Sequence, residues 1–368
     1  MLNRPRARDI GLIFGHLPTG PLNSITDIPG IKVGHCTLIK GEGKLIPGKG
    51  PIRTGVTVII PGIENPFKYK LRAASYVING FGKPIGLIQL NELGQLETPI
   101  ALTNTLNVGL VADAIIEYML KLNPDIGVTT GSVNPVVLEC NDSYLNDIRG
   151  RHVKHEHVFK AIENANNKLV EEGAVGAGTG MSAFEFKGGI GTASRKLPNK
   201  LGGYIVGALV LSNFGRREDL MINGVPVGLE LKDYMRSPTP QKGGSIVMII
   251  ATNAPLNSRQ LRRLAKRATH GLARTGSYSS HGSGDFVVAF TTANKIPHYH
   301  EEPLIEEKIL FEPQLSLLFK AAAEAVEEAI INSLLKAETM TGRDNHIRYA
   351  IPIDKLIEIM NKYGRLKR

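Results

Sequence analysis

The chain has 368 residues, of which 42% are hydrophobic and 21% are charged, a composition typical of a soluble globular protein. Its net charge of +10 suits an anionic partner without establishing one, and its two cysteines, Cys36 and Cys140, exclude a disulfide scaffold and a cysteine-rich metal site. No signal-sized apolar stretch follows the basic N-terminus, and no segment approaches the roughly 20 apolar residues that cross a bilayer, so we expect a cytoplasmic protein.

The first part of the chain predicts strands. Residues 20–36 combine a Pro-Gly turn with a short alternating strand. A second strand, over residues 53–61, alternates and then becomes fully apolar before a proline stops it. Residues 86–90 predict a third strand.

Helices and glycine-rich turns follow. Apolar residues at helical spacing predict a long, well-packed helix over 107–120, and a more polar helix is expected over 152–172. Between these two helices, residues 129–144 begin as a turn, become a strand and end in a polar cluster. Residues 173–195 are rich in glycine but lack the Gly-Lys-Ser/Thr ending of a phosphate-binding loop, so they predict closely packed hairpins.

Two buried strands surround the most informative junction. Residues 204–215 predict one of them, ending in Asn-Phe-Gly. A proline-containing stretch over 236–242 predicts an exposed loop, and two glycines then deliver the chain to Ser245. The six apolar residues that follow, 246–251, are mostly β-branched and predict a strand buried on both faces.

The last part of the chain predicts three helices and one more strand. A helix over 258–273 carries five cations and no acid, a loop of small residues over 275–285 leads into a strand over 286–290, and two helices are expected over 314–335 and 354–363. No linker or internal repeat divides the chain, so residues 1–368 predict a single domain. Strands interleaved with amphipathic helices indicate an α/β protein in which helices cover sheets.

The junction between Gly244 and Ser245 has the chemistry of a self-cleaving bond. A serine hydroxyl beside a conformationally permissive glycine peptide can attack the preceding carbonyl and give an ester that water hydrolyses. The new chain would start at Ser245, and its free α-amine, with a pKa of roughly 7.7–8.0, would be a base beside the hydroxyl that it activates. An ordinary loop-to-strand junction is the alternative, because Gly-Gly-Ser is common in loops.

Two other features favour structural roles. The cations of the helix over 258–273 predict a solvated face or pairs with acids elsewhere, since nucleic-acid binding adds exposed aromatic residues or a known module. The segment His152, Lys154, His155, Glu156, His157 lacks the His-Glu-x-x-His spacing of a zinc site, so no metal is expected there.

Three further polar clusters stand at strand ends, and together with the junction they carry a resemblance to a known family. The chain resembles the self-processing serine aminopeptidases (peptidase family S58), typified by L-aminopeptidase/D-amidase-esterase and the β-peptidyl aminopeptidases. The similarity runs along nearly the whole chain, in the blocks Arg8-Asp9, 23–35, 53–57, 141–150, 243–246, 251–256 and 282–285.

That resemblance implies a four-layer αββα sandwich of the type shared with ornithine acetyltransferase, with layers like those of the N-terminal-nucleophile hydrolases but a different connectivity. It also implies cleavage into a long chain of residues 1–244 and a short chain of residues 245–368. The two chains would stay associated and assemble as a tetramer of heterodimers. The implied reaction releases N-terminal residues from peptides, amides or esters, with no metal or cofactor.

Site residues are carried over position by position from the resemblance. Ser245 matches the nucleophile, Asn213 matches an asparagine that stabilises the oxyanion, and Tyr144 matches a tyrosine that lines the site. Ser283 and Asp285 match a serine and an acid that assist proton transfer, although β-aminopeptidases are expected to carry the longer glutamate at the second position.

A substrate's ammonium group requires a carboxylate near the nucleophile, and Asp142 and Glu139 are the available acids, with Asp142 favoured. Structural roles remain open for several of these residues: Asn213 could cap a turn, Tyr144 could belong to the core, and Asp285 could order its loop.

Two other functions are compatible with the sequence. An acyltransferase similar to ornithine acetyltransferase shares the implied layers and self-processing, but those enzymes use threonine at the cleavage point, where this chain has Ser245. A basic nucleic-acid-binding protein without catalysis would depend on the cationic helix over 258–273.

Overall fold

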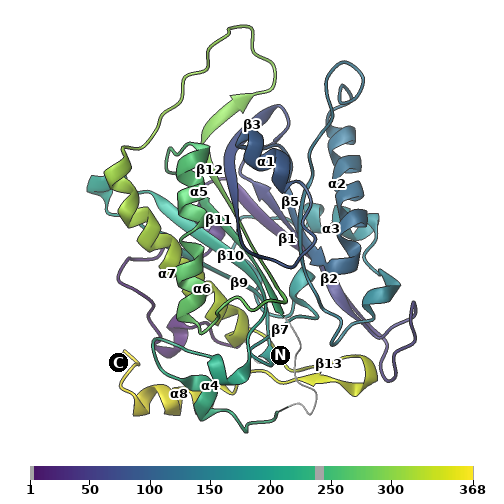
Figure 1. Ribbon diagram of the computed structural model, residues 1–368, viewed down its shortest axis with the longest axis vertical. Coiled ribbons are helices and arrows are strands. Elements are labelled where there is room, and N and C mark those ends of the chain that lie inside the picture. The colour runs from purple at the N-terminus through teal and green to yellow at the C-terminus, as the bar shows by residue number, and fades with distance from the viewer. Residues whose placement is uncertain (1–3, 237–243, 368) are drawn as a thin grey trace.

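The computed structural model describes residues 4–236 and 244–367 and shows two β-sheets packed face to face between two layers of helices (Figure 1). The smaller sheet has four strands in the order β1-β2-β5-β6: β1 (Ile31–Lys40), β2 (Ile52–Pro61), β5 (Ile100–Asn104) and β6 (Val136–Cys140). The larger sheet has six strands in the order β4-β3-β12-β11-β10-β9: β4 (Gln95–Leu96), β3 (Tyr69–Gly80), β12 (Ser283–Pro297), β11 (Gly244–Thr252), β10 (Ile205–Asn213) and β9 (Gly189–Lys196).

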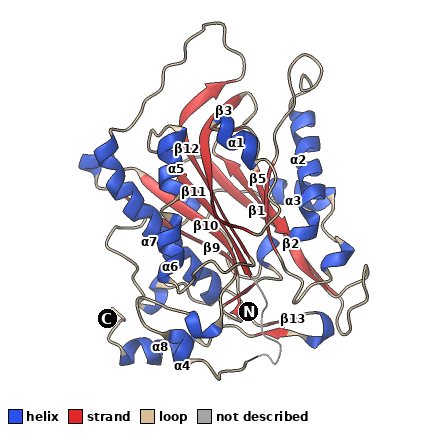
Figure 2. Ribbon diagram, viewed as in Figure 1, coloured by secondary structure: helices blue, strands red, loops and turns tan. Residues whose placement is uncertain are grey.

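Helices cover the outer face of each sheet, as Figure 2 shows. α2 (Val108–Leu122) and α3 (His155–Glu163) pack on the four-stranded sheet. α5 (Ser258–Ala265), α6 (Ala268–Arg274) and α7 (Leu315–Leu335) form the layer on the six-stranded sheet. The four-layer αββα sandwich expected from the family resemblance is therefore confirmed.

The side chains of β11 alternate between the two faces of the sheet, so this strand contributes to two hydrophobic cores. Val247, Ile249 and Ala251 point between the sheets, where they meet Leu138 and Cys140 of β6. Ile246, Met248 and Ile250 point to the other face, toward the helix layer that includes Leu261 and Leu264 of α5. A strand buried on both faces needs apolar residues at every position, which is what residues 246–251 supply.

β11 lies in the interior of the six-stranded sheet. It runs antiparallel to β10 and parallel to β12, and the crossover between the two parallel strands contains α5 and α6. Both edges of β11 form backbone hydrogen bonds, one with β10 and the other with β12. The start of β11 is therefore held in a fixed register against both strands.

A buried group of charges joins the N-terminal part of the chain to α7. Arg195 of β9 is fully buried and forms ion pairs with Glu324 at 3.2 Å and Glu328 at 2.7 Å. Glu328 also pairs with Arg8 at 2.8 Å, and Nδ2 of Asn23 donates to it at 2.5 Å. Several donors therefore neutralise the buried carboxylate of Glu328, and they hold its pKa below the usual value despite its burial.

The structure corrects several expected elements. The strand predicted over 86–90 is the start of α1 (Leu87–Leu93), a short amphipathic helix that leaves Ile88 exposed; a short apolar run does not distinguish a strand from a helix. The polar helix predicted over 152–172 ends at Glu163, because Asn164 caps it and Asn166 pairs with β1. The basic helix divides into α5 and α6. The long strand β3 and the short strand β5 were not predicted.

Smaller elements lie at the edge where the site is located. They are the ribbons β7 (Ser182–Ala183) with β8 (Phe186–Lys187) and β13 (Met340–Thr341) with β14 (Ile347–Arg348), and the helices α4 (Val227–Glu230) and α8 (Ile353–Lys362). β7 and β8 are the hairpin expected within residues 173–195. Apart from Arg236, the loop predicted over 236–242 falls outside the described residues. No described helix is long and apolar enough to span a membrane.

Candidate active site

Ser245 is the second residue of β11 and is buried. Its backbone lies opposite Asn213 of β10 on one side and Gly284 of β12 on the other. The N–H of Gly284 donates a hydrogen bond to the Ser245 hydroxyl oxygen at 3.3 Å. The candidate nucleophile is therefore fixed at the head of an interior strand, with a neighbour on each edge.

Asn213 is the last residue of β10, and its side chain has a defined orientation. Its Oδ1 accepts a hydrogen bond from the backbone N–H of Ser182 at 2.9 Å, and its Nδ2 donates to the carbonyl of Asn141 at 2.9 Å. These contacts fix which end of the amide faces which neighbour. Because paired residues project to the same side of a sheet, Asn213 and Ser245 share the face that points between the two sheets.

Ser283 and Asp285 are the first and third residues of β12 and form a buried pair. The Ser283 hydroxyl donates to Oδ1 of Asp285 at 2.5 Å. Burial raises the pKa of Asp285, while hydrogen bonds from Ser283 and Ser279 oppose that shift. Asp285 therefore keeps a proton to a higher pH than a surface aspartate would.

The register places this pair beside the backbone of Ser245. Gly284 lies opposite Ser245, and Asp285 lies opposite Ile246. By alternation, Ser283 and Asp285 project from the helix-covered face of the sheet, as Val287 and Ala289 do. No hydrogen bond in the described part of the chain joins them to the Ser245 hydroxyl; they lie opposite Gly244 and Ile246, the residues on either side of Ser245.

Tyr144 lies in the loop after β6 and is held by the C-terminal part of the chain. Its ring stacks on His346, with centroids 4.6 Å apart and an interplanar angle of 18°, and the guanidinium carbon of Arg348 lies 3.5 Å from the ring centroid. The ring of His346 also bonds the Tyr144 carbonyl through Nδ1 at 2.9 Å. The tyrosine ring is therefore in contact with both His346 and Arg348.

The two acids considered for the substrate ammonium are both buried. Oε1 of Glu139 accepts from the N–H of Lys83 at 2.9 Å, and the Thr105 hydroxyl donates to Oε2. Oδ1 of Asp142 accepts from Asn146 at 3.0 Å. Burial raises the pKa of Asp142 to about 7. Both oxygens of Glu139 are therefore engaged, whereas Oδ2 of Asp142 is buried and has no hydrogen-bond partner among the described residues; the choice between the two acids stays a prediction.

Sequence reasoning missed Lys187, Ser182 and Arg348. Lys187 is fully buried, and its ammonium donates to the carbonyls of Gly178, Met181 and Gly188 at 3.0, 2.8 and 2.6 Å. Burial lowers the pKa of Lys187 to about 7, and the carboxylate of Asp142 opposes that shift. This lysine fixes the turn that presents the Ser182 N–H to Asn213. Its only sequence signal was its place in a glycine-rich segment.

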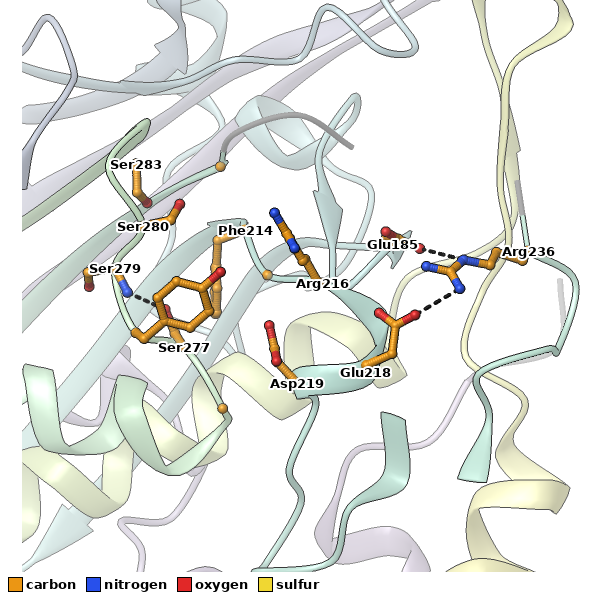
Figure 3. A pocket seen from close by; sticks show the side chains of 14 residues that line it. Glu185, Phe214, Arg216, Glu218, Asp219, Arg236, Ser277, Ser279, Ser280 and Ser283 are labelled. Carbon is orange, nitrogen blue, oxygen red and sulfur yellow. Dashed lines mark hydrogen bonds and ion pairs between the residues drawn. The ribbon is translucent and has the colours of Figure 1, made fainter. Parts of the chain in front are cut away.

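A polar cavity of about 770 Å³ opens beside the start of β11 (Figure 3). Ser283 and Gly244 contribute to its wall, together with the serines at 277, 279 and 280 and with residues that follow β10. On one side Arg236 bridges Glu185 and Glu218, at 3.4 Å and 2.8 Å, while Arg216 points into the cavity (Figure 3). The cavity could admit a polar substrate to the end of the sheet at which β11 begins and Ser245 lies.

The cations of α5 are largely engaged. Arg259 and Arg263 both pair with Glu312, and the guanidinium groups of Arg263 and Arg267 lie over the ring of Phe319. This arrangement agrees with the expected pairing with acids elsewhere. Among the described residues, no group of three or more histidine, cysteine or acidic side chains is placed to hold a metal ion.

Comparison with known proteins agrees with this geometry. Residues 23–348 match the sequence profile of Peptidase family S58. The chain is 42% identical to the β-peptidyl aminopeptidase BapA of Sphingosinicella microcystinivorans, over 98% of this chain and 93% of that protein.

Two solved structures are similar over nearly the whole chain. The PH0078 protein of Pyrococcus horikoshii OT3 superposes with a TM-score of 0.94 at 63% identity, covering 98% of this chain and 100% of that one. The L-aminopeptidase D-Ala-esterase/amidase of Ochrobactrum anthropi, described as a prototype for the serine aminopeptidases and a variant of the Ntn-hydrolase fold, superposes with a TM-score of 0.91 at 38% identity, covering 99% and 100% of the two chains.

Proposed function

The chain belongs to Peptidase family S58 and is an aminopeptidase, and we propose that its activity depends on an acyl-enzyme at Ser245, formed after the chain cleaves itself between Gly244 and Ser245. The observation that carries the proposal is the pairing of Ser245 with Asn213 at the head of β11. A hydroxyl nucleophile and a carboxamide donor lie on the same face of adjacent strands. Ser283 and Asp285 lie on the adjacent strand β12, opposite Gly244 and Ile246.

Self-cleavage would use the same hydroxyl as catalysis. The Ser245 oxygen attacks the Gly244 carbonyl carbon, the C–N bond breaks, and the proton from the hydroxyl passes to the departing Ser245 nitrogen. Water then hydrolyses the ester, which leaves residues 1–244 with a new carboxylate and residues 245–368 with a new α-amine. That amine has an ordinary pKa near neutrality, so it can act as the base for the next reaction.

In catalysis, the Ser245 hydroxyl attacks the carbonyl of the substrate's N-terminal residue, and its proton passes to the neighbouring α-amine, which Ser283 and Asp285 of the adjacent strand would assist. The amide of Asn213 and the hydroxyl of Tyr144 hold the developing oxyanion; one such donor is typically worth about 2.7–4 kcal/mol. The leaving amine takes the proton, and water releases the acyl group. Asp142 or Glu139 would receive the substrate's ammonium.

The proposal extends to the assembly of the two chains, their location and their substrates. As a single 368-residue domain, the chain would remain one folded unit after cleavage, and four such heterodimers would assemble. A cytoplasmic location agrees with the scarcity of cysteine. Relatives act on β-peptides in one case and on L-aminoacyl and D-alanyl substrates in another, so both classes are candidate substrates.

Ser245→Ala tests the proposal directly. The wild-type protein should give two fragments that meet at Gly244/Ser245, by denaturing gel and intact-mass analysis, and should hydrolyse an aminoacyl p-nitroanilide. The variant should remain one chain of 39.9 kDa with no activity. A variant that still splits, or a wild-type chain that is active while uncut, would refute the proposal. Acetyl transfer between amino acids without anilide hydrolysis would favour the acyltransferase alternative.

A further inference from the structure

Arg348 lies within the group of residues that surrounds the proposed oxyanion donors. It is the last residue of β14, and its side chain is 1% exposed. Its Nε donates to the Ser182 hydroxyl at 3.1 Å, and its guanidinium lies over the ring of Tyr144. The backbone of that same Ser182 donates to Asn213, which faces Ser245. Arg348 is thus connected to both proposed oxyanion donors.

The two terminal nitrogens of this arginine are unsatisfied. Nη1 and Nη2 are both buried, and neither has a hydrogen-bond partner among the described residues. Most buried polar groups in folded proteins are hydrogen-bonded, and a buried cation without partners is costly. The unused end of the guanidinium presents parallel N–H groups, a fork that matches the two oxygens of a carboxylate.

The charges around Arg348 leave a positive excess. Its acidic neighbour Glu185 is already paired with Arg236, which also binds Glu218. Arg217 lies close enough for its charge and that of Arg348 to repel each other, and its own donors are directed to backbone carbonyls. Burial lowers the pKa of Arg348, while Tyr144 and Glu185 oppose that shift. An anion is the ligand that would relieve both the repulsion and the unused donors.

We propose that Arg348 binds the C-terminal carboxylate of a short peptide whose scissile bond lies at Ser245. The inference rests on the function proposed above and deepens it by naming the substrate class. The substrate's N-terminal ammonium would be repelled by this cation, so Arg348 faces the leaving group. Arg348 contacts Ser182, the N–H of Ser182 bonds Asn213, and Asn213 lies opposite Ser245, so only two residues connect the cation to the nucleophile. The proposal accordingly places the carboxylate on one of the first residues after the scissile bond, as in dipeptides and tripeptides.

Three substrates with the same first residue test this. They are the aminoacyl p-nitroanilide, the dipeptide with a glycine leaving group, and the amide of that dipeptide. For the wild-type enzyme, kcat/KM should favour the free acid over the amide roughly ten- to a hundred-fold, the effect of a charge-assisted hydrogen-bonded pair. In Arg348→Gln that ratio should fall to near one, and in Arg348→Lys it should be intermediate.

The ratio separates carboxylate binding from a structural role. Loss of the stacking on Tyr144 would lower activity on all three substrates together and leave the ratio unchanged, which would overturn the inference. A ratio near one in the wild-type enzyme would also overturn it, and this measurement requires no variant. Arg259→Gln removes an exposed charge on α5 that does not line the cavity, and it should change the ratio by less than about two-fold. Hydrolysis of the anilide by the wild-type enzyme, lost in Ser245→Ala, tests the proposed function separately.

Discussion

Asn213 and Ser245 lie directly opposite each other on adjacent antiparallel strands, and their side chains share one face of the sheet. The asparagine amide is oriented by two hydrogen bonds of 2.9 Å, from Ser182 and to Asn141. Such a preorganised donor needs no rearrangement when charge develops on the substrate oxygen, which is the condition for strong electrostatic stabilisation.

Asn213→Ala should reduce kcat by roughly 10²–10³-fold, because it removes one oxyanion donor. Steady-state kinetics with an aminoacyl p-nitroanilide measures the effect. Ser212→Ala, on the same strand but on the opposite face, is the matched control and should retain kcat within a few-fold. Equal losses in the two variants would show that β10 is merely sensitive to substitution.

Asp285→Asn should move the acidic limb of the kcat/KM profile to lower pH. The carboxylate lies one residue along the paired strand from Ser245, so when ionised it favours the protonated α-amine and raises the pKa of that amine. Without this charge, the α-amine loses its proton at a lower pH, so it can act as the base at a lower pH. A pH profile of kcat/KM measures the shift; an unchanged limb would mean that Asp285 only orders its loop.

Lys187→Met should destabilise the fold by about 3–5 kcal/mol, because it leaves three backbone carbonyls and Asp142 without their cation. Adding Asp142→Asn should recover part of that loss, with a coupling of about 1–3 kcal/mol in the double-mutant cycle. Urea unfolding gives the free energies. Lys121→Met, at an exposed helical ion pair, is the control and should cost less than about 1 kcal/mol. Strict additivity would contradict the electrostatic interaction between Lys187 and Asp142.

His35 should make the protein sensitive to mild acid. Burial lowers the pKa of this histidine to about 4, while Nδ1 contacts the Thr57 hydroxyl at 2.9 Å. The unfolded chain binds a proton near pH 6.5, and the folded chain does so only near its depressed pKa. The stabilisation is therefore fully present above pH 6.5 and is lost as the pH falls toward 4, by about 3 kcal/mol. In His35→Asn the free energy of unfolding should fall less over that interval; parallel curves would contradict the assignment.

Gly191→Ala tests the contact between β9 and α7. An added Cβ would lie 1.9 Å from the carbonyl oxygen of Ala329, so the helix would have to move, at a cost of about 3 kcal/mol or more. Gly109→Ala in α2 is the control, because nothing lies within 4 Å of the added atom. That variant should be neutral or more stable by up to about 1 kcal/mol. Thermal unfolding of the two variants should shift in opposite directions or differ clearly in size.

The sequence predicts the elements whose local pattern of apolar residues matches the burial of those residues in the fold. The apolar run 246–251 is buried on both faces as expected, and the helix over 107–120 is α2. The residues of the polar clusters at Asn213, Ser245 and Ser283 meet at one edge, because β10, β11 and β12 are neighbours. The roles assigned to these residues remain predictions.

Other features depend on long-range packing that no local pattern reports. β3 alternates apolar residues with Lys70 and Arg72, so its charged side chains concealed a long strand beside β12. The position of Arg348 over Tyr144 requires the chain to return to this edge after α7, and such a contact between residues far apart in sequence leaves no periodic signal. Lys187 was missed for a similar reason, because its partners are backbone carbonyls.

Because β11 and β12 lie between β10 and β3 in the six-stranded sheet, the pieces made by a cut before Ser245 would share one continuous network of backbone hydrogen bonds. Arg195 and the two glutamates of α7 would form buried ion pairs across the same boundary. Such fragments would have no independent folded state, so dilution could not dissociate them and subunits could not exchange between molecules. Their one-to-one stoichiometry would be set at synthesis and kept until the molecule is degraded.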